Sequence, residues 1–187
     1  MKTAIATLKS ISPYSQSKNY DAAKLPRELA NDFEERTWKE RGHWTAEGKL
    51  FIPPMQFKNC ISDAAKYLGK QVPGKGKNTY TKHFESGIIV PEALILPISK
   101  DTVTKDRVYV PSDGKRGGGK RVWKNFPLVP EWAGDVTYVI IDDIITEDVF
   151  REHLEMAGQL IGIGRWRPRN NGMFGRFSVV DMTFVGN

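Results

Sequence analysis

The sequence is poor in the features that build disulfide frameworks, zinc sites and membrane spans. Cys60 is the single cysteine among 187 residues, which excludes an intramolecular disulfide and a cysteine-clustered zinc site. No apolar run approaches the roughly 18–20 residues that are needed to cross a bilayer. The apolar stretch after Met1 meets Lys9 too early for a signal peptide. These absences lead us to expect a cytoplasmic protein that has no membrane contact.

Signatures of catalysis are equally sparse. The segment 117–120, Gly-Gly-Gly-Lys, lacks the spacing and the following Ser or Thr of a P-loop. A lone carboxylate such as Asp113 is a weak signal for a metal site. We therefore expect no cofactor, no metal and no catalytic residue, and predict that the protein is not an enzyme.

What the sequence does contain is positive charge that is gathered into three segments. The chain has 28 Lys and Arg against 22 Asp and Glu, for a formal charge of +6. Residues 66–82, 113–124 and 162–177 carry +5, +4 and +4, so the remaining residues carry −7. Glycines in these segments let a backbone approach a phosphate, and two of the segments hold a tryptophan on which a base can stack. The pattern favours nucleic-acid binding over solvated lysine loops.

The hydrophobic pattern predicts an α+β fold. Apolar residues recur at helical spacing in two segments, each with a residue suited to begin a helix, Pro54 and Thr146. Core strands are predicted over residues 3–12, 88–96, 135–145 and 176–185, and the second is expected to be interrupted at Pro91, at an edge or a bulge. The order strand–helix–strand–strand–helix–strand predicts a ferredoxin-like (βαββαβ) antiparallel sheet with both helices on one face.

We interpret residues 1–187 as one domain with two insertions. Residues 20–49 form an acidic insertion, in which a helix is predicted near residues 27–41. Residues 99–134 form a long basic excursion rich in glycine and proline, of a size that is uncommon unless it is functional. Its low apolar content predicts that it stays mobile until a contact orders it.

The most informative segment is the arginine loop, residues 162–177, which contains four glycines and four arginines. Its arginines are Arg165, Arg167, Arg169 and Arg176. Gly162 is a candidate helix C-cap, and the first three arginines would project to one side of an extended segment as a row of phosphate contacts. Gly172 and Gly175 would act as flexible joints around an apolar tip that includes Phe174. The alternative is that the arginines bind acidic residues of the same protein or of a neighbour.

A glycine- and arginine-rich loop before the last strand of such a fold resembles the signature loop of the RAMP superfamily, the RNA-binding Cas proteins of CRISPR effector complexes. Residues 51–65, Phe-Ile-Pro-Pro-Met-Gln-Phe-Lys-Asn-Cys-Ile-Ser-Asp-Ala-Ala, are similar to its strand–proline–helix motif. Ile52, Pro53 and Lys58 match that motif, whereas residues 54–56 and 59 depart from it. Backbone subunits of that superfamily carry a long inserted hairpin, the thumb, between the second and third core strands, and residues 99–134 take that place here. The chain also resembles stand-alone proteins of phages and prophages.

The resemblance implies a protein that binds single-stranded RNA or single-stranded DNA without sequence preference and assembles as a filament along the strand. It would be a helical homo-oligomer in a bacterial or phage-infected cell, and other CRISPR-effector-like or phage replication proteins are further candidate partners. The expected nucleic-acid contacts are Gln56, Lys58, Asn59, Lys66, Lys75, Lys77, Lys115, Arg116, Lys120, Arg121, Trp123, Lys124, Arg165, Trp166, Arg167, Arg169, Phe174 and Arg176.

Two alternatives remain open at this point. Some RAMP proteins are metal-independent ribonucleases that use a histidine as general base, and the candidates here are His43, His83 and His153. His83 follows the lysine-rich segment and is the best placed for proton transfer from a 2′-hydroxyl. The other alternative is a phage inhibitor that mimics a subunit of a host effector.

Overall fold

The computed structural model describes residues 1–112, 117 and 119–186. At its centre lies a four-stranded sheet in which every neighbouring pair of strands is antiparallel. In the order in which they lie side by side, the strands are β4 (Ile88–Ile89), β8 (Ala133–Ile140), β1 (Lys2–Ser10) and β9 (Phe177–Gly186).

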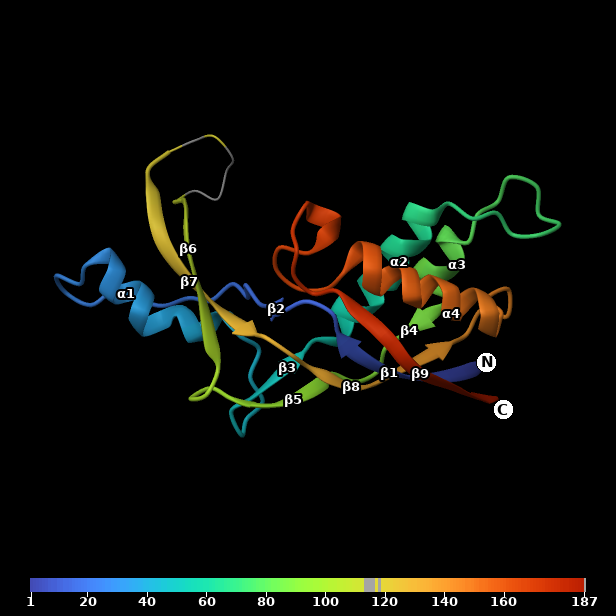
Figure 1. Cartoon of the computed structure of the whole chain (residues 1–187), viewed down its shortest axis with the longest axis horizontal. Helices are drawn as coiled ribbons and strands as arrows, with labels where there is room; N and C mark the ends of the chain where they lie inside the picture. Colours follow the sequence, from blue (N-terminus) through green and yellow to red (C-terminus); the bar gives the residue numbers. More distant parts are fainter. Residues whose placement is uncertain (113–116, 118, 187) are drawn as a thin grey trace.

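Two main helices cross between these strands and cover one side of the sheet (Figure 1). The first is α2 (Pro54–Leu68), between β1 and β4, and the second is α4 (Glu147–Met156), between β8 and β9. A short helix, α3 (Thr81–Ser86), precedes β4, and a π-helical turn, η2 (Ala157–Ile161), extends α4. The chain order and the strand order are those of a ferredoxin-like fold, so the predicted α+β class and its βαββαβ core are confirmed.

The helix ends follow from local chemistry. Pro54 stands in the first turn of α2, where its missing N–H costs nothing, and Gly69 ends the helix in a left-handed conformation (φ +57°). The Thr146 hydroxyl caps α4 by accepting a hydrogen bond from the Val149 N–H at 3.3 Å. Gly162, with φ +70°, caps the π-helical turn as predicted.

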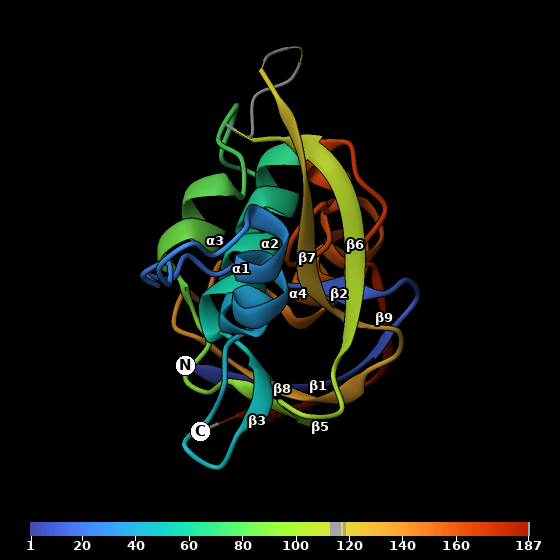
Figure 2. The ribbon, with the colours of Figure 1, turned by 90° about the vertical axis from the view of Figure 1, so that its left-hand side faces the viewer.

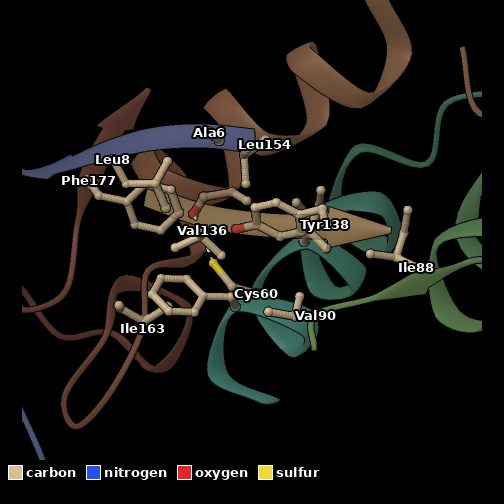
Figure 3. Close-up of a cluster of buried hydrophobic side chains, with 14 of the residues drawn as sticks. Ala6, Leu8, Cys60, Ile88, Val90, Val136, Tyr138, Leu154, Ile163 and Phe177 are labelled. Carbon is tan, nitrogen blue, oxygen red and sulfur yellow. Dashed lines mark hydrogen bonds between the residues drawn. The ribbon is translucent and has the colours of Figure 1, made fainter. Parts of the chain in front are cut away.

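The core lies between the helices and the inner face of the sheet (Figure 3). Every second residue of β1 and of β8 is buried there, as the period of a strand requires. The main core side chains are Ala4, Ala6, Leu8, Phe57, Cys60, Ile61, Val136, Tyr138, Ile140, Phe150, Leu154 and Phe177. Full burial of one large apolar side chain contributes about 1.5–3 kcal/mol, so this layer is the main source of stability.

The predicted strand over residues 88–96 is in fact two strands in different sheets. Residues 88–89 form β4 of the main sheet, whereas β5 (Leu94–Ser99) pairs with β3 (Lys49–Ile52) in a separate two-stranded sheet. Pro91 separates the two strands. A proline has no N–H to donate to a ladder, which explains why pairing stops there.

The basic excursion contains regular structure, as the resemblance to the thumb of backbone subunits implies. It contains a hairpin of β6 (Thr104–Pro111) and β7 (Arg121–Val129), which pair over eight residues each. β7 also pairs with β2 (Tyr14–Ser15), which joins the hairpin to the chain just after β1. We keep the name thumb for residues 99–134. The hairpin extends away from the main sheet at one end of the molecule (Figure 1).

The acidic insertion forms α1 (Ala30–Thr37) and a 3-10 turn, η1 (Trp38–Arg41), and packs against β7 (Figure 2). Glu34 accepts a hydrogen bond from the Asn125 N–H at 2.6 Å, while Arg41 donates to the Asn125 carbonyl at 2.8 Å and to Glu34. Glu35 pairs with Lys105 of β6 at 2.6 Å. The insertion therefore braces the described part of the thumb instead of leaving it free to move.

Among the described residues, no helix is long and apolar enough to cross a bilayer.

Candidate nucleic-acid interface

The arginine loop lies between the thumb and the helices (Figure 1) and is closed by its own backbone hydrogen bonds. The Ile163 N–H donates to the Gly175 carbonyl at 3.0 Å, and the Phe174 N–H donates to the Trp166 carbonyl at 3.0 Å. A Cβ on Gly172 would lie 1.8 Å from the Trp166 carbonyl oxygen. The glycines are therefore sites of close backbone packing, and the expectation of flexible joints is wrong.

The arginines do not form a row, because the segment turns instead of running extended. Residues 168–170 form a 3-10 turn, η3 (Pro168–Asn170), and Trp166 adopts φ +58°. Arg167 pairs with Asp63 of α2 at 3.2 Å, Arg176 donates to the Gln159 carbonyl at 3.0 Å, and Arg169 is exposed. Arg167 therefore binds an acidic residue of the same protein, which was the alternative to a phosphate contact. The same is true of Arg165.

Arg165 joins the loop to the thumb. Its guanidinium pairs with Asp106 of β6, donates to the Ser15 hydroxyl at 3.0 Å and stacks 4.1 Å from the centre of the Phe126 ring. Its side chain is only 14% exposed. Burial lowers the pKa of Arg165 and Asp106 raises it, so the charge survives because its partner is close. Arg165 therefore holds the arginine loop to the thumb, and it also lines the hollow described below.

An aromatic pair, of which Trp166 is exposed and Phe174 half-buried, lies on the same loop. The rings of Trp166 and Phe174 meet edge to face with their centres 5.7 Å apart, and Trp166 is 47% exposed. Next to them, Met173 is exposed. Such a face offers a base a surface on which to stack.

A polar hollow of about 340 Å³ lies where the arginine loop meets the start of α2. Its lining residues are Gln16, Ser17, Lys18, His43, Gln56, Asn59, Gly164, Arg165, Arg167 and Asn170. Three of them are cations and none is a carboxylate. Burial lowers the pKa of His43, and the charge of Lys18 lowers it further, so this imidazole is neutral at pH 7. The hollow thus presents three cations to an anion, of which Arg165 and Arg167 also pair with Asp106 and Asp63, and Lys18 adds a further positive charge.

The residues predicted on α2 divide between the hollow and the helix surface. Gln56 and Asn59 line the hollow, and Gln56 accepts a hydrogen bond from the Tyr14 hydroxyl at 2.8 Å. The Lys58 amine instead donates to Ser62 and to the carbonyls of residues 84 and 85, at 2.8–3.0 Å. These contacts use all three of its N–H groups, which removes Lys58 from the interface. Lys66 pairs with Glu85 at 2.6 Å.

The remaining residues that the sequence singled out lie away from the hollow or outside the described residues. Lys75 and Lys77 are exposed on the loop between α2 and α3, at the end of the molecule away from the thumb (Figure 1). Lys120, Arg121, Trp123 and Lys124 lie on or beside β7 and border a groove on the thumb. Lys115, Arg116 and Asp113 fall outside the described residues.

The three histidines occupy different environments. His83 Nδ1 lies 2.6 Å from the Asp142 carboxylate, beside a hollow of about 380 Å³ that Lys77 and Lys82 also line. His153 is buried against Phe84, with ring centres 4.4 Å apart. In the part of the chain that the structure describes, no group of three or more His, Cys, Asp or Glu could hold a metal ion.

Sequence reasoning missed six of the residues that line the hollow: Gln16, Ser17, Lys18, His43, Gly164 and Asn170. Lys18 and Gln16 follow β2, and His43 follows η1, so both segments lie far along the chain from the arginine loop. The Gln16 amide donates to the Phe51 carbonyl at 2.7 Å, and its side-chain oxygen accepts from the His43 N–H at 2.6 Å. This bridge brings the acidic insertion to the hollow, and no local pattern signals it.

Comparison with known proteins gave likenesses of fold. No family model and no curated protein sequence matches the chain. The chain is similar to Cmr6 from Pyrococcus furiosus, with 13% identity, a TM-score of 0.47, and 96% of this chain and 99% of that chain covered. It is also similar to a chain of a CRISPR RNA-guided surveillance complex, with 9% identity, a TM-score of 0.40, and 96% and 66% covered. At these values neither match says what this chain binds.

Proposed function

We propose that the protein binds single-stranded nucleic acid, RNA or DNA, at the arginine loop. The observation that carries the proposal is the hollow, which places Lys18, Arg165 and Arg167 together without a lining carboxylate. The first turn of α2 borders it through the Gln56 side chain. A phosphate of the strand would occupy this hollow.

The exposed ring of Trp166, packed against the half-buried Phe174, gives the neighbouring bases a stacking surface. Stacking accepts every base, because each has a flat aromatic face, and phosphate contacts carry no sequence information. The combination therefore favours binding without sequence preference.

We further propose that several copies assemble side by side along one strand. The hairpin of the thumb extends beyond the main sheet (Figure 1), where it can reach a neighbouring copy on the same strand. Contact between adjacent copies would make binding to long strands cooperative.

The first test is the salt dependence of binding to a labelled oligonucleotide. If about six phosphates are contacted, the slope of log affinity against log salt should be roughly −4, since each contact to a single strand contributes about −0.7. The variant Lys18→Gln with Arg167→Gln should bind about tenfold or more weakly, since each removes a charge-assisted hydrogen bond.

The matched control is Lys9→Gln with Lys49→Gln, which removes the same charge from exposed positions on β1 and β3. The control should bind within about threefold of the wild type. A flat salt response, or equal losses in the two double variants, would contradict the proposed site. Titration by fluorescence anisotropy at several salt concentrations measures both.

A second candidate function, cleavage of RNA, is favoured by the pair of His83 and Asp142. Although burial raises it, the pKa of Asp142 is lowered overall by hydrogen bonds from His83 and from the Ile144 N–H. The carboxylate thus orients the imidazole, which would take the 2′-hydroxyl proton as that oxygen attacks the phosphorus. The products would be a 2′,3′-cyclic phosphate and a 5′-hydroxyl, whose oxygen gains a proton from water.

We expect labelled RNA to stay intact when it is incubated with the protein, with or without Mg²⁺, as gel analysis would show. The competing function replaces ours if RNA is cut and if His83→Ala stops the cutting without weakening binding. Asp142→Asn should then also slow the cutting, because it removes the group that orients the imidazole.

A further inference from the structure

A groove of about 580 Å³ lies between the acidic insertion and the hairpin of the thumb, apart from the hollow at the arginine loop. One wall comes from the insertion and the other from β6, β7 and the residue before β7. The lining residues are Lys24, Leu29, Ala30, Asn31, Phe33, Glu34, Tyr109, Lys120, Arg121, Val122, Trp123 and Lys124. Figure 2 looks onto this end of the molecule, with α1 beside the hairpin.

The groove has an exposed aromatic and apolar surface. Trp123 is 43% exposed, Tyr109 50% and Leu29 69%. The Trp123 ring does not stand alone, because the Arg107 guanidinium lies 4.7 Å from its centre and the Tyr109 ring 5.1 Å. These contacts hold a large flat ring at the surface, where it has no apolar partner that would bury it fully.

Cations outnumber carboxylates among the residues that line the groove. Four lining residues are cations: Lys24, Lys120, Arg121 and Lys124. Glu34 is the one lining carboxylate, and it is only 7% exposed because Arg41 and the Asn125 N–H bind it. Glu28 and Glu35 are likewise paired, with Arg36 and Lys105. The insertion thus uses these three acids in internal contacts and contributes a lysine to the groove.

We infer that this groove is a second binding site for the same single strand, at which a base stacks on Trp123 and the four cations hold the adjacent phosphates. The inference rests on the proposed function and adds to it a role for the acidic insertion. A polyanion matches the charge of the groove, and a base matches its flat ring. An aromatic ring beside four cations is not the surface that a basic or purely apolar partner would need.

The first test asks whether a base stacks on Trp123. On a 20-nucleotide strand, Trp123→Ala should lower the affinity about tenfold, within the range of about 5- to 150-fold that stacking of one base provides. Trp123→Phe should restore most of the loss, and Tyr67→Ala, which removes an exposed ring on α2, should have no effect. Thermal unfolding of each variant checks that the fold is intact.

The second test removes two positive charges from the groove, in the variant Lys120→Gln with Arg121→Gln. If both side chains contact phosphates, the salt slope should become shallower by about 1.4, twice the contribution of one contact. In a third arm, a strand carrying 4-thiouracil is irradiated, and mass spectrometry should find a crosslink on a peptide of β7.

The outcomes separate the two proposals. Loss of affinity in both Trp166→Ala and Trp123→Ala supports both sites. If Trp166→Ala weakens binding while Trp123→Ala and the charge variant bind as the wild type does, the groove is overturned and the arginine loop stands. A wild-type protein that binds no strand overturns both. Competition of the strand by an acidic peptide at equal affinity would also overturn the groove as a nucleic-acid site.

Discussion

The variant Asp106→Ala should unfold with a free energy about 3 kcal/mol lower than that of the wild type. The carboxylate pairs with Arg165, and the two side chains are only 21% and 14% exposed. Removal of one partner leaves a buried guanidinium without its counter-charge, which typically costs about 3–5 kcal/mol. The partial exposure of this pair places the effect at the low end of that range. Urea denaturation measures the difference.

The matched control is Glu40→Ala, which removes the carboxylate of an exposed pair in which Glu40 is 48% and Lys100 39% exposed. Such a surface pair contributes about 0–1 kcal/mol, so this variant should be nearly as stable as the wild type. Asp106→Ala should also speed amide hydrogen exchange in β6 and β7, because Arg165 joins the thumb to the arginine loop. Equal stability of the two variants would show that the pair of Arg165 and Asp106 does not hold the arginine loop to the thumb.

The variant Gly175→Ala should lose about 3 kcal/mol or more of stability together with nucleic-acid binding. Gly175 has φ +76°, and a Cβ there would lie 1.8 Å from the Ile163 carbonyl oxygen. The left-handed conformation alone costs about 1–2 kcal/mol in any residue with a Cβ. The loop must also open to relieve the clash, and it then loses the Ile163 N–H bond to Gly175 and the Gly175 N–H bond to Pro13, each worth about 1 kcal/mol.

Gly74→Ala is the matched control for this effect. Gly74 has nearly the same backbone angle, φ +74°, but nothing lies within 4 Å of a Cβ built there. This variant should lose only the conformational cost, about 1–2 kcal/mol, and should bind an oligonucleotide normally. Thermal melts compare the stability of the two variants, and a titration with a labelled oligonucleotide compares their affinity. If both lose the same stability and both bind, the arginine loop tolerates opening, and the close packing of its backbone does not shape the site.

The core of the fold could be predicted from sequence because its signals are local. The alternation of Ala4, Ala6 and Leu8 places β1 against the helices, and Thr146 and Gly69 mark helix ends through contacts within one turn. The hairpin of the thumb was implied only by the resemblance, because β6 contains no buried residue and so shows no local pattern of a core strand. Exposed and half-exposed residues alternate along β6, and its support comes from pairing with β7 and from the acidic insertion.

The candidate site, like the fold, could be predicted from the sequence only in part. The sequence by itself determined that basic and aromatic residues gather in a glycine-rich loop before the last strand, and that acidic residues gather in an insertion. Only the tertiary structure decided which arginine pairs with an acid and which borders a hollow. An arginine in a loop has the same sequence pattern whether its partner is Asp106, Asp63 or a phosphate. Its partner is the charge that the fold brings within a few ångströms, because the attraction between charges in water becomes weak beyond that distance.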